Sequence, residues 1–319
     1  MELIKLKPAF KDYLWGGDKL KQLYNKKTDL EIVAESWELS THKDGSSIIA
    51  SGSHQGESFK DFIENSDESI IGIKASKFPF FPVLIKFIDA KKALSIQVHP
   101  SDEYALKYEN SYGKTEAWYV LEAEPNAFLY YGFKDEISKE EMAQRIKDNT
   151  FLDVLRKVEV KQGDIAVIDA GTIHAIGEGI VICEIQQNSN ITYRVYDYDR
   201  RGIDGKPRQL HIEQALEVTN LKPIDHEVAN CNFQNFEGYK KGQIVACKYF
   251  SADIVEVATE YQELVTADSF KSFTVVSGSG EIMANEQSFC FEKGDTFFAT
   301  ANLGSVKIKG NAKIIIAYV

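Results

Sequence analysis

The chain has 319 residues, of which 44% are hydrophobic and 27% charged, and its formal net charge at pH 7 is −11. This is the composition of a soluble globular protein, and the acidic balance disfavours nucleic acid as a partner. A small phosphate ester remains compatible, because a local pocket of basic side chains outweighs a diffuse, screened net charge. Since no apolar run reaches the length of a signal-peptide core or a membrane span, we expect a cytoplasmic protein with no membrane partner.

Short β-rich runs bounded by turn residues recur along the first two thirds of the chain, which is typical of an all-β sandwich or barrel. They span residues 47–51, 81–88, 94–98, 118–121, 128–131, 165–168, 180–185 and 192–196. Helices are predicted only as inserts, at about residues 58–66, 101–109, 138–156 and 210–219. The third insert opens with Ser138 and Glu141 at the spacing of a capping box.

Four potential metal ligands lie where these strands begin or end. Residues 94–100 read LSIQVHP, a strict alternation that projects Gln97 and His99 from one face of a strand. Glu116 begins another strand, and His174 lies in a GTIHA motif further on. Two imidazoles, a carboxylate and an amide suit a divalent transition metal with room left for a substrate. Ligands from three strands need a sheet curved around them, as in antiparallel barrels of the cupin type.

Residues 222–238 mix proline, asparagine and glycine without periodicity, so a domain boundary is predicted there. From residue 247 onward the pattern is almost purely β. We predict a mainly β protein made of two cupin-type jelly-roll or β-sandwich domains with a few inserted α-helices. Residues 1–225 form the metal-binding domain in this prediction. Residues 226–319 form a cupin-like domain that lacks such a metal site, because no histidine follows His226.

Three charged residues could add chemistry to the metal site. Alternation turns Arg194 toward the barrel interior, where an arginine is costly unless it meets a carboxylate or a bound anion. It is therefore either a ligand contact or half of a buried ion pair, and Glu184 is either its partner or an acid/base group. Lys114 lies close to Glu116, and a lysine near a divalent cation is pushed toward its neutral form, which suits proton transfer. A loop-surface lysine is the alternative.

The motifs taken together resemble the type I mannose-6-phosphate isomerase (phosphomannose isomerase) family in its short Bacillus-like form. The resemblance covers most of residues 10–220, whereas the C-terminal part shares only the β pattern. It rests on YLWGG at 13–17, ESWE at 35–38, LSIQVHP at 94–100, GKTEAW at 113–118, AGTIHA at 170–175 and QQNSNITYRVYDYDR at 186–200.

The resemblance implies an aldose-ketose isomerase that interconverts mannose 6-phosphate and fructose 6-phosphate and carries one zinc ion per chain. Arg194 matches the active-site arginine of the family, and Lys114 and Glu184 match an active-site lysine and glutamate. Longer members carry a histidine directly before that lysine, where this chain has Gly113, so any role of that histidine does not carry over. The implied zinc ligands are Gln97, His99, Glu116 and His174.

We hypothesise that the metal polarises the C1 and C2 oxygens of the open-chain sugar, so that a base can move the C2 proton to C1 through a cis-enediol. Lys114 and Glu184 are the candidates for that base or its relay. Arg194 would stabilise the enediolate or hold the phosphate of the sugar phosphate substrate. Further cations that could assist with the phosphate are Arg200, Arg201 and Lys86.

Two alternative functions stay open at this point. An iron(II) oxygenase also uses two histidines and one carboxylate, but it needs vacant coordination positions, so Gln97 as a fourth ligand argues against it. A non-catalytic sugar-binding cupin would keep the metal or the arginine only as an anchor for its ligand. For the assembly we expect a monomer or a weak homodimer.

Overall fold

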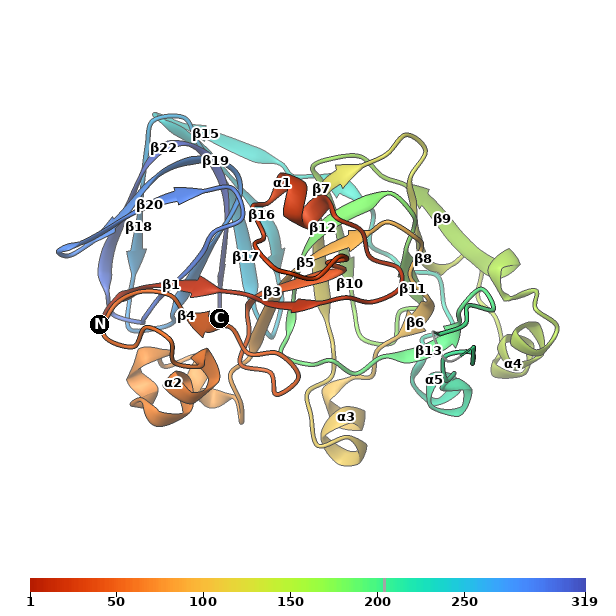
Figure 1. The fold of residues 1–319 in the computed structure, drawn as a ribbon. Coiled ribbons are helices and arrows are strands. Elements are labelled where there is room, and N and C mark those ends of the chain that lie inside the picture. Colours follow the sequence, from red (N-terminus) through yellow and green to blue (C-terminus); the bar gives the residue numbers. More distant parts are fainter. Residues whose placement is uncertain (203–204) are drawn as a thin grey trace.

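The computed structural model describes residues 1–202 and 205–319. Figure 1 shows two β-barrels side by side, one formed largely by the C-terminal strands in blue and the other by strands from earlier in the chain. Helices lie at the periphery, so the predicted mainly β fold with a few inserted helices is confirmed. No helix among the described residues is long and apolar enough to span a membrane.

One wall of the first barrel is a seven-stranded antiparallel sheet. Its spatial order is β14 (Ala229–Asn230), β10 (Asp164–Ile168), β7 (Glu116–Ala123), β12 (Ile180–Gln187), β5 (Val83–Ala90), β3 (Glu35–Leu39) and β2 (Ala9–Lys11). Strands β5 and β12 are buried along all 8 of their residues, because both faces of the sheet are covered there. Alternate side chains point into the first barrel, and the others pack against the second barrel.

The opposite wall is a five-stranded sheet. Its order is β13 (Tyr193–Tyr196), β6 (Ile96–Val98), β11 (His174–Ile176), β8 (Phe128–Phe133) and β9 (Leu155–Glu159). Apolar side chains from both sheets fill part of the space between them, with Trp118, Val120 and Ile182 from one sheet meeting Leu129 and Ile176 from the other. Polar side chains on the same inward faces form the candidate site.

The second barrel is a ten-stranded sheet that takes in two strands from the start of the chain. Strand β1 pairs with β21 from Leu3 opposite Ala299 to Leu6 opposite Thr296, and Leu3 enters the core of this barrel. The strands are β1 (Leu3–Lys7), β4 (Ile48–Ile49), β15 (Phe233–Phe236), β16 (Tyr239–Ala246), β17 (Ser251–Val257), β18 (Glu260–Val265), β19 (Lys271–Ala284), β20 (Gln287–Glu292), β21 (Thr296–Ala299) and β22 (Gly304–Tyr318).

Strands cross the boundary that the sequence suggests at residues 225 and 226. β1 and β4 precede it but join the sheet of the second barrel, whereas β14 follows it but pairs with β10 of the first. The division into domains 1–225 and 226–319 stays a prediction. Because strands from each side of this boundary pair within the other barrel, the two barrels are connected by strand pairing as well as by the chain between them.

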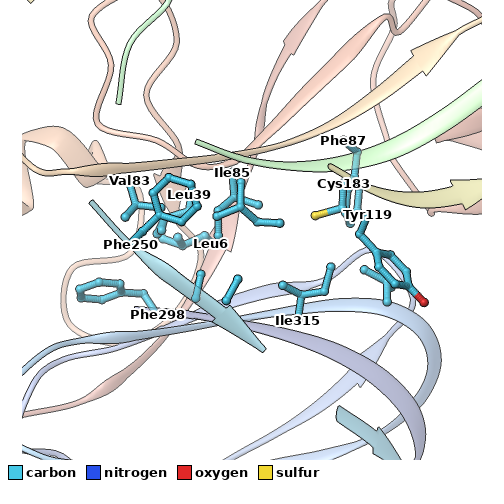
Figure 2. Packing of buried hydrophobic residues seen from close by; sticks show 14 of the residues in the cluster. Leu6, Leu39, Val83, Ile85, Phe87, Tyr119, Cys183, Phe250, Phe298 and Ile315 are labelled. Atoms are coloured by element: carbon cyan, nitrogen blue, oxygen red, sulfur yellow. The ribbon is translucent and has the colours of Figure 1, made fainter. Parts of the chain in front are cut away.

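The two barrels share an apolar interface. Figure 2 shows Val83 and Ile85 of β5 facing Phe298 of β21 and Ile315 of β22 across it. All four side chains are fully buried. The outer face of the seven-stranded sheet therefore packs against the second barrel.

A buried ion pair also crosses this interface. Lys26 Nζ lies 2.7 Å from Glu38 Oε1 and donates a hydrogen bond of 2.5 Å to the carbonyl oxygen of Gly294. The hydroxyl of Thr296 donates to Glu38 Oε2 at 3.3 Å. Because these partners come from both barrels, the pair ties a loop and a strand of the first barrel to the second.

The described residues form five α-helices and three 3-10 turns around the barrels. Three predicted inserts contain helices that are slightly shorter than expected. The predicted helix at 138–156 starts as expected, since the Glu141 N–H donates to Ser138 Oγ at 3.0 Å, but it ends at Lys147. Asn149 takes a left-handed conformation, with φ of 58°, and the residues beyond it form a 3-10 turn and then β9. The elements are α1 (Lys19–Leu23), α2 (Phe59–Asn65), α3 (Asp102–Tyr108), α4 (Lys139–Lys147), α5 (Ile212–Val218), η1 (Glu68–Ile70), η2 (Ala75–Lys77) and η3 (Phe151–Val154).

Candidate active site and metal centre

Three of the predicted site residues form a row across the five-stranded sheet. Gln97 on β6 is the cross-strand partner of His174 on β11 and, on its other side, of Arg194 on β13. Cross-strand partners project from the same face of a sheet, so all three side chains point to one side. His99 directly follows β6 and lies two residues after Gln97, which turns it to the same side.

A second row faces the first from the seven-stranded sheet. Trp118 on β7 is paired with Glu184 on β12. Glu184 is paired in turn with Lys86 on β5, and Lys86 with Trp37 on β3. Glu116 lies two residues before Trp118 and so shares its face. The barrel thus places the predicted carboxylates opposite the predicted imidazoles.

The ligating atoms of His99, Glu116 and His174 lie within 4.8 Å of one another, and all three side chains are buried. Glu116 Oε1 lies 3.2 Å from His174 Nε2, and Glu116 Oε2 lies 3.8 Å from His99 Nε2. The Gln97 amide nitrogen lies 3.4 Å from His174 Nε2. A half-turn of this amide directs its oxygen to the same point, so it can act as a fourth ligand.

Both histidines present Nε2 to this cluster, where Lys114 Nζ also lies 3.4 Å from His99 Nε2. Nδ1 of His99 donates to the carbonyl of Ile191 at 2.7 Å, and Nδ1 of His174 donates to that of Thr172 at 2.9 Å, which leaves each Nε2 with its lone pair. Burial lowers the pKa of both imidazoles, that of His174 to about 4. Glu116 Oε1 is buried and accepts no hydrogen bond from the described residues. An unpartnered carboxylate oxygen beside two neutral imidazoles fits a divalent transition metal such as zinc.

Lys114 connects this cluster to Glu184. Its Nζ lies 2.6 Å from Glu116 Oε2 and 3.5 Å from Glu184 Oε1. Burial acts to lower the pKa of Lys114, but the two carboxylates outweigh it and raise the pKa, so the protein groups favour the charged amine. For Glu184, burial acts to raise the pKa, but Lys114 and Lys86 outweigh it and lower the pKa to about 2. Glu184 is therefore ionised at neutral pH.

A glycine sets the position of the loop that carries Lys114. The N–H of Gly113 donates to Asp102 Oδ1 at 2.8 Å, and the N–H of Lys114 donates to the carbonyl of Pro100 at 3.1 Å. A Cβ atom on Gly113 would lie 2.5 Å from the backbone nitrogen of Asp102. Only glycine can lie this close to the start of α3, and this close approach fixes where Lys114 and Glu116 enter the barrel.

The two oxygens of Glu184 have different surroundings. Oε1 accepts a hydrogen bond of 3.0 Å from Trp118 Nε1, whereas Oε2 is buried and accepts none from the described residues. Lys86 Nζ lies 3.7 Å from Glu184 Oε2 and 3.4 Å from Glu35 Oε2. Glu35 is held by Trp37, whose Nε1 donates to its Oε2 at 2.6 Å. Lys86 thus lies between two carboxylates, each fixed by a tryptophan.

These side chains line a cavity of about 270 Å³ between the two sheets. Gln97, Lys114, Glu184 and Arg194 all contribute to its wall, as the sequence predicts. The Nη1 of Arg194 donates to the carbonyl of Gln209 at 2.9 Å, but its Nε is buried without an acceptor among the described residues. An arginine with a free N–H beside a cavity is suited to bind an anionic group.

Of the other cations suggested as phosphate contacts, only one lines the cavity. Lys86 lines the cavity, but Arg200 is paired with Asp197 and donates to the carbonyl of Ala93 at 2.6 Å. Arg201 donates to a carbonyl of its own loop. Sequence reasoning missed Arg208, which also pairs with Asp197 but reaches the cavity. Arg208 belongs to a stretch without alternation, so no local pattern indicated the side to which it turns.

The barrel brings together all of the residues singled out from the sequence as catalytic or metal-ligating. Antiparallel sheets that close around a His/Glu/His cluster, with a second barrel behind, define a cupin protein with a group that could bind a metal. The residues gathered in this way are Gln97, His99, Lys114, Glu116, His174, Glu184 and Arg194.

Comparisons with known proteins identify the family within this class. Residues 3–152 match the catalytic domain of type I phosphomannose isomerase, and residues 240–319 match the cupin domain of mannose-6-phosphate isomerase. A mannose-6-phosphate isomerase of Bacillus subtilis is 33% identical over 318 residues, 99% of each chain. One from Streptococcus mutans is 34% identical over 306 residues, covering 96% of this chain and 94% of that protein. The chain belongs to the type I mannose-6-phosphate isomerase family and is accordingly an isomerase.

The three-dimensional structure agrees with this assignment. The crystal structure of mannose 6-phosphate isomerase from Bacillus subtilis matches this one with a TM-score of 0.92 and 32% sequence identity, and the match covers 100% of both chains. The cupin fold predicted for both barrels is thereby confirmed.

Proposed function

We propose that this chain interconverts mannose 6-phosphate and fructose 6-phosphate with one zinc ion per chain. The relatives from Bacillus and Streptococcus carry the name of this isomerase and match nearly the whole chain. Gln97, His99, Glu116 and His174 would hold the zinc. The observation that carries this assignment is the buried Glu116 Oε1, which lacks a hydrogen-bond donor beside the imidazole of His174. When bound, zinc supplies Lewis acidity that polarises the sugar oxygens and acidifies the C2 proton.

Glu184 is the proposed base for proton transfer. Glu184 lines the cavity, and its Oε2 accepts no hydrogen bond from the described residues, so a lone pair is available for the C2 proton. It takes that proton and returns it to C1 through a cis-enediol. Lys114 lies between Glu184 and the metal ligand Glu116, where a charged amine can donate a hydrogen bond to a substrate oxygen or relay a proton.

The phosphate of the substrate is assigned to the arginine side of the cavity. Arg194 and Arg208 both line it, and Arg194 lies on the sheet opposite the one that carries Lys86 and Glu184. Their guanidinium groups present donors in a planar fork that matches phosphate oxygens. Arg194 is the cross-strand partner of the proposed metal ligand Gln97 and can also stabilise charge on the enediolate.

The first test is a coupled assay of fructose 6-phosphate formation from mannose 6-phosphate. It is run on the protein as purified, after chelation, and after zinc is restored. Activity that chelation abolishes and zinc restores supports both the reaction and the metal. No turnover with an occupied metal site would contradict the proposal.

The second test separates the two candidate bases. Removal of a general base typically lowers turnover by about 100- to 10,000-fold. We expect such a loss in Glu184→Ala, and a loss in Lys114→Ala as well if it relays the proton. If neither variant loses ten-fold in kcat, both roles are wrong.

The two alternative functions fit the site less well. A sugar-binding module needs no buried, ionised carboxylate with a free oxygen, and the relatives carry the name of an isomerase. Iron content together with oxygen consumption would instead support the oxygenase. We further propose that the enzyme acts in the cytoplasm as a monomer or weak homodimer.

A further inference from the structure

The proton-transfer site has a neighbour that the reaction as proposed does not use. Glu35 lines the same cavity and is 7% exposed, and among the described residues it forms no ion pair or hydrogen bond with the metal cluster or with Lys114. Its partners are Trp37 and Lys86. A buried carboxylate is costly, so its retention in a cavity wall calls for a role beyond packing.

Lys86 is shared between Glu35 and Glu184. Its ammonium lies 3.4 Å from Glu35 Oε2 and 3.7 Å from Glu184 Oε2. Both separations exceed the roughly 2.7–2.9 Å of a charge-assisted hydrogen bond, so neither carboxylate has closed on the amine. The amine also lies over the ring of Trp37, 4.6 Å from its centroid, and is 2% exposed as a residue. With solvent excluded, the two carboxylates compete directly for one cation.

This competition bears on the oxygen that would act as the base. Glu184 Oε2 has no hydrogen-bond donor among the described residues, and Lys86 Nζ lies 3.7 Å from it. If the negative charge of Glu35 were removed, Lys86 would move toward Glu184 and donate to Oε2. The lone pair needed for the C2 proton would then be occupied.

We propose that Glu35 is a positioning residue that keeps Glu184 Oε2 available to the substrate by drawing Lys86 toward itself. Trp37 fixes Glu35 for this purpose, as Trp118 fixes the other oxygen of Glu184. The proposal rests on the proposed role of Glu184 as the base. It assigns no contact between Glu35 and the substrate.

Glu35→Gln is the decisive variant, because glutamine can still accept the hydrogen bond from Trp37 but carries no charge. We expect kcat for mannose 6-phosphate to fall by about 10- to 100-fold, with KM within about three-fold of the original value, because an occupied Oε2 lone pair impairs proton transfer more than substrate binding. A kcat within three-fold of wild type, or a change confined to KM, would overturn the proposal.

Glu38→Gln is the matched control. Glu38 lies on the same strand, is also buried and also pairs with a lysine, but that lysine is Lys26 at the interface between the barrels. We expect this variant to lower the melting temperature while leaving kcat unchanged. If it lowers kcat as much as Glu35→Gln does, the effect at Glu35 is one of stability and the proposal fails.

A double-mutant cycle with Lys86→Met tests whether Glu35 acts through Lys86. If it does, adding Glu35→Gln to Lys86→Met lowers kcat by less than about three-fold, because there is no amine left to misplace. Equal losses in both backgrounds would refute the mechanism. Should Lys86→Met fall below detection, Glu35→Asp replaces it: a kcat above that of Glu35→Gln supports the charge-based role, and an equal kcat contradicts it.

Glu184→Gln in the same assay separates this inference from the proposed function. Wild-type kcat in Glu184→Gln would remove the proposed base and, with it, the ground for a role of Glu35. A strongly impaired Glu184→Gln beside a normal Glu35→Gln would leave the proposed function intact and overturn the inference alone.

Discussion

Protonation of the Glu116 carboxyl group is expected to make zinc affinity depend on pH. Burial raises its pKa to about 8, while the imidazoles of His99 and His174 are neutral at neutral pH because burial lowers their pKa. A carboxylate binds zinc only in its ionised form. Below about pH 8, zinc binding is therefore expected to release a proton from Glu116, so that zinc affinity rises with pH up to about 8 and then levels off.

Calorimetric titration of the metal-free protein with zinc, at pH 7 in two buffers of different ionisation enthalpy, measures this proton release. A binding enthalpy that does not depend on the buffer would contradict the prediction. The variant Glu116→Gln should bind zinc more weakly and release no proton from this site.

Arg208 is expected to act on substrate affinity more than on turnover. It lines the cavity and pairs with Asp197, and it forms no ion pair with Glu184 or Glu116 among the described residues. Loss of a charged contact to phosphate typically costs about 2 to 5 kcal/mol. We expect Arg208→Ala to raise KM for mannose 6-phosphate by at least ten-fold with a smaller change in kcat.

Steady-state kinetics of Arg208→Ala checks this prediction, with Arg201→Ala as the control. Arg201 belongs to the same loop, but it is exposed and its side chain bonds a loop carbonyl. An unchanged KM in Arg208→Ala would place the phosphate elsewhere in the cavity.

Individual site residues could be identified from the sequence where they lie in a strong local pattern. Gln97 and His99 alternate along one strand, and the structure places both beside His174. Glu35 and Arg208 were missed for different reasons. The alternation of Glu35 with Trp37 was visible, but nothing local indicated that their common face lines a cavity. Arg208 turns toward the cavity through an ion pair with Asp197, a contact that depends on the fold of the whole loop.

Among the elements, the loop before β7 is the most sensitive to substitution. An alanine at Gly113 would bring its Cβ to 2.5 Å from the backbone nitrogen of Asp102. The loop must then move, because a backbone atom at the start of α3 cannot rotate away. We expect Gly113→Ala to destabilise the fold by about 1 to 3 kcal/mol and to lower kcat, since Lys114 and Glu116 follow directly. Urea unfolding and the isomerase assay measure the two effects, and normal kcat would contradict the second.

Strands and helix starts could be predicted where a local sequence pattern extends over several residues. The alternation of the strands and the capping box at Ser138 both correspond to observed structure. The helix predicted to reach residue 156 ends at Lys147 because the left-handed Asn149 and the pairing of β9 with β8 decide its end. Such strand pairing joins distant segments, and it leaves no signal in a local window.

For the whole molecule, the interface between the barrels should make unfolding cooperative. Phe298 of the second barrel is fully buried against side chains of the first. A buried Phe→Ala change typically costs about 3 to 5 kcal/mol. We therefore expect Phe298→Ala to lower the melting temperature of one common transition. Scanning calorimetry showing a second barrel that melts separately while the first keeps its melting temperature would contradict this expectation.

The overall architecture followed from the sequence only in part. Two β domains could be inferred from the recurring strands and from the break in periodicity at 222–238. The membership of β1 in the sheet of the second barrel could not be inferred, because Leu3 pairs with Ala299 at the far end of the chain. The sequence of a strand does not indicate with which distant strand it pairs.

The position of β1 has a consequence for synthesis on the ribosome. Its pairing partner β21 is made long after it, since Leu3 pairs with Ala299, and at about 5 to 20 residues per second the delay between the two is roughly 15 to 60 seconds. During that time the first strand has no neighbour on its β21 side. Early folding of the first barrel must therefore leave this strand loose, and a nascent chain that buries it prematurely would close the second barrel incorrectly. Strand order thus delays closure of the second barrel until β21 has been made.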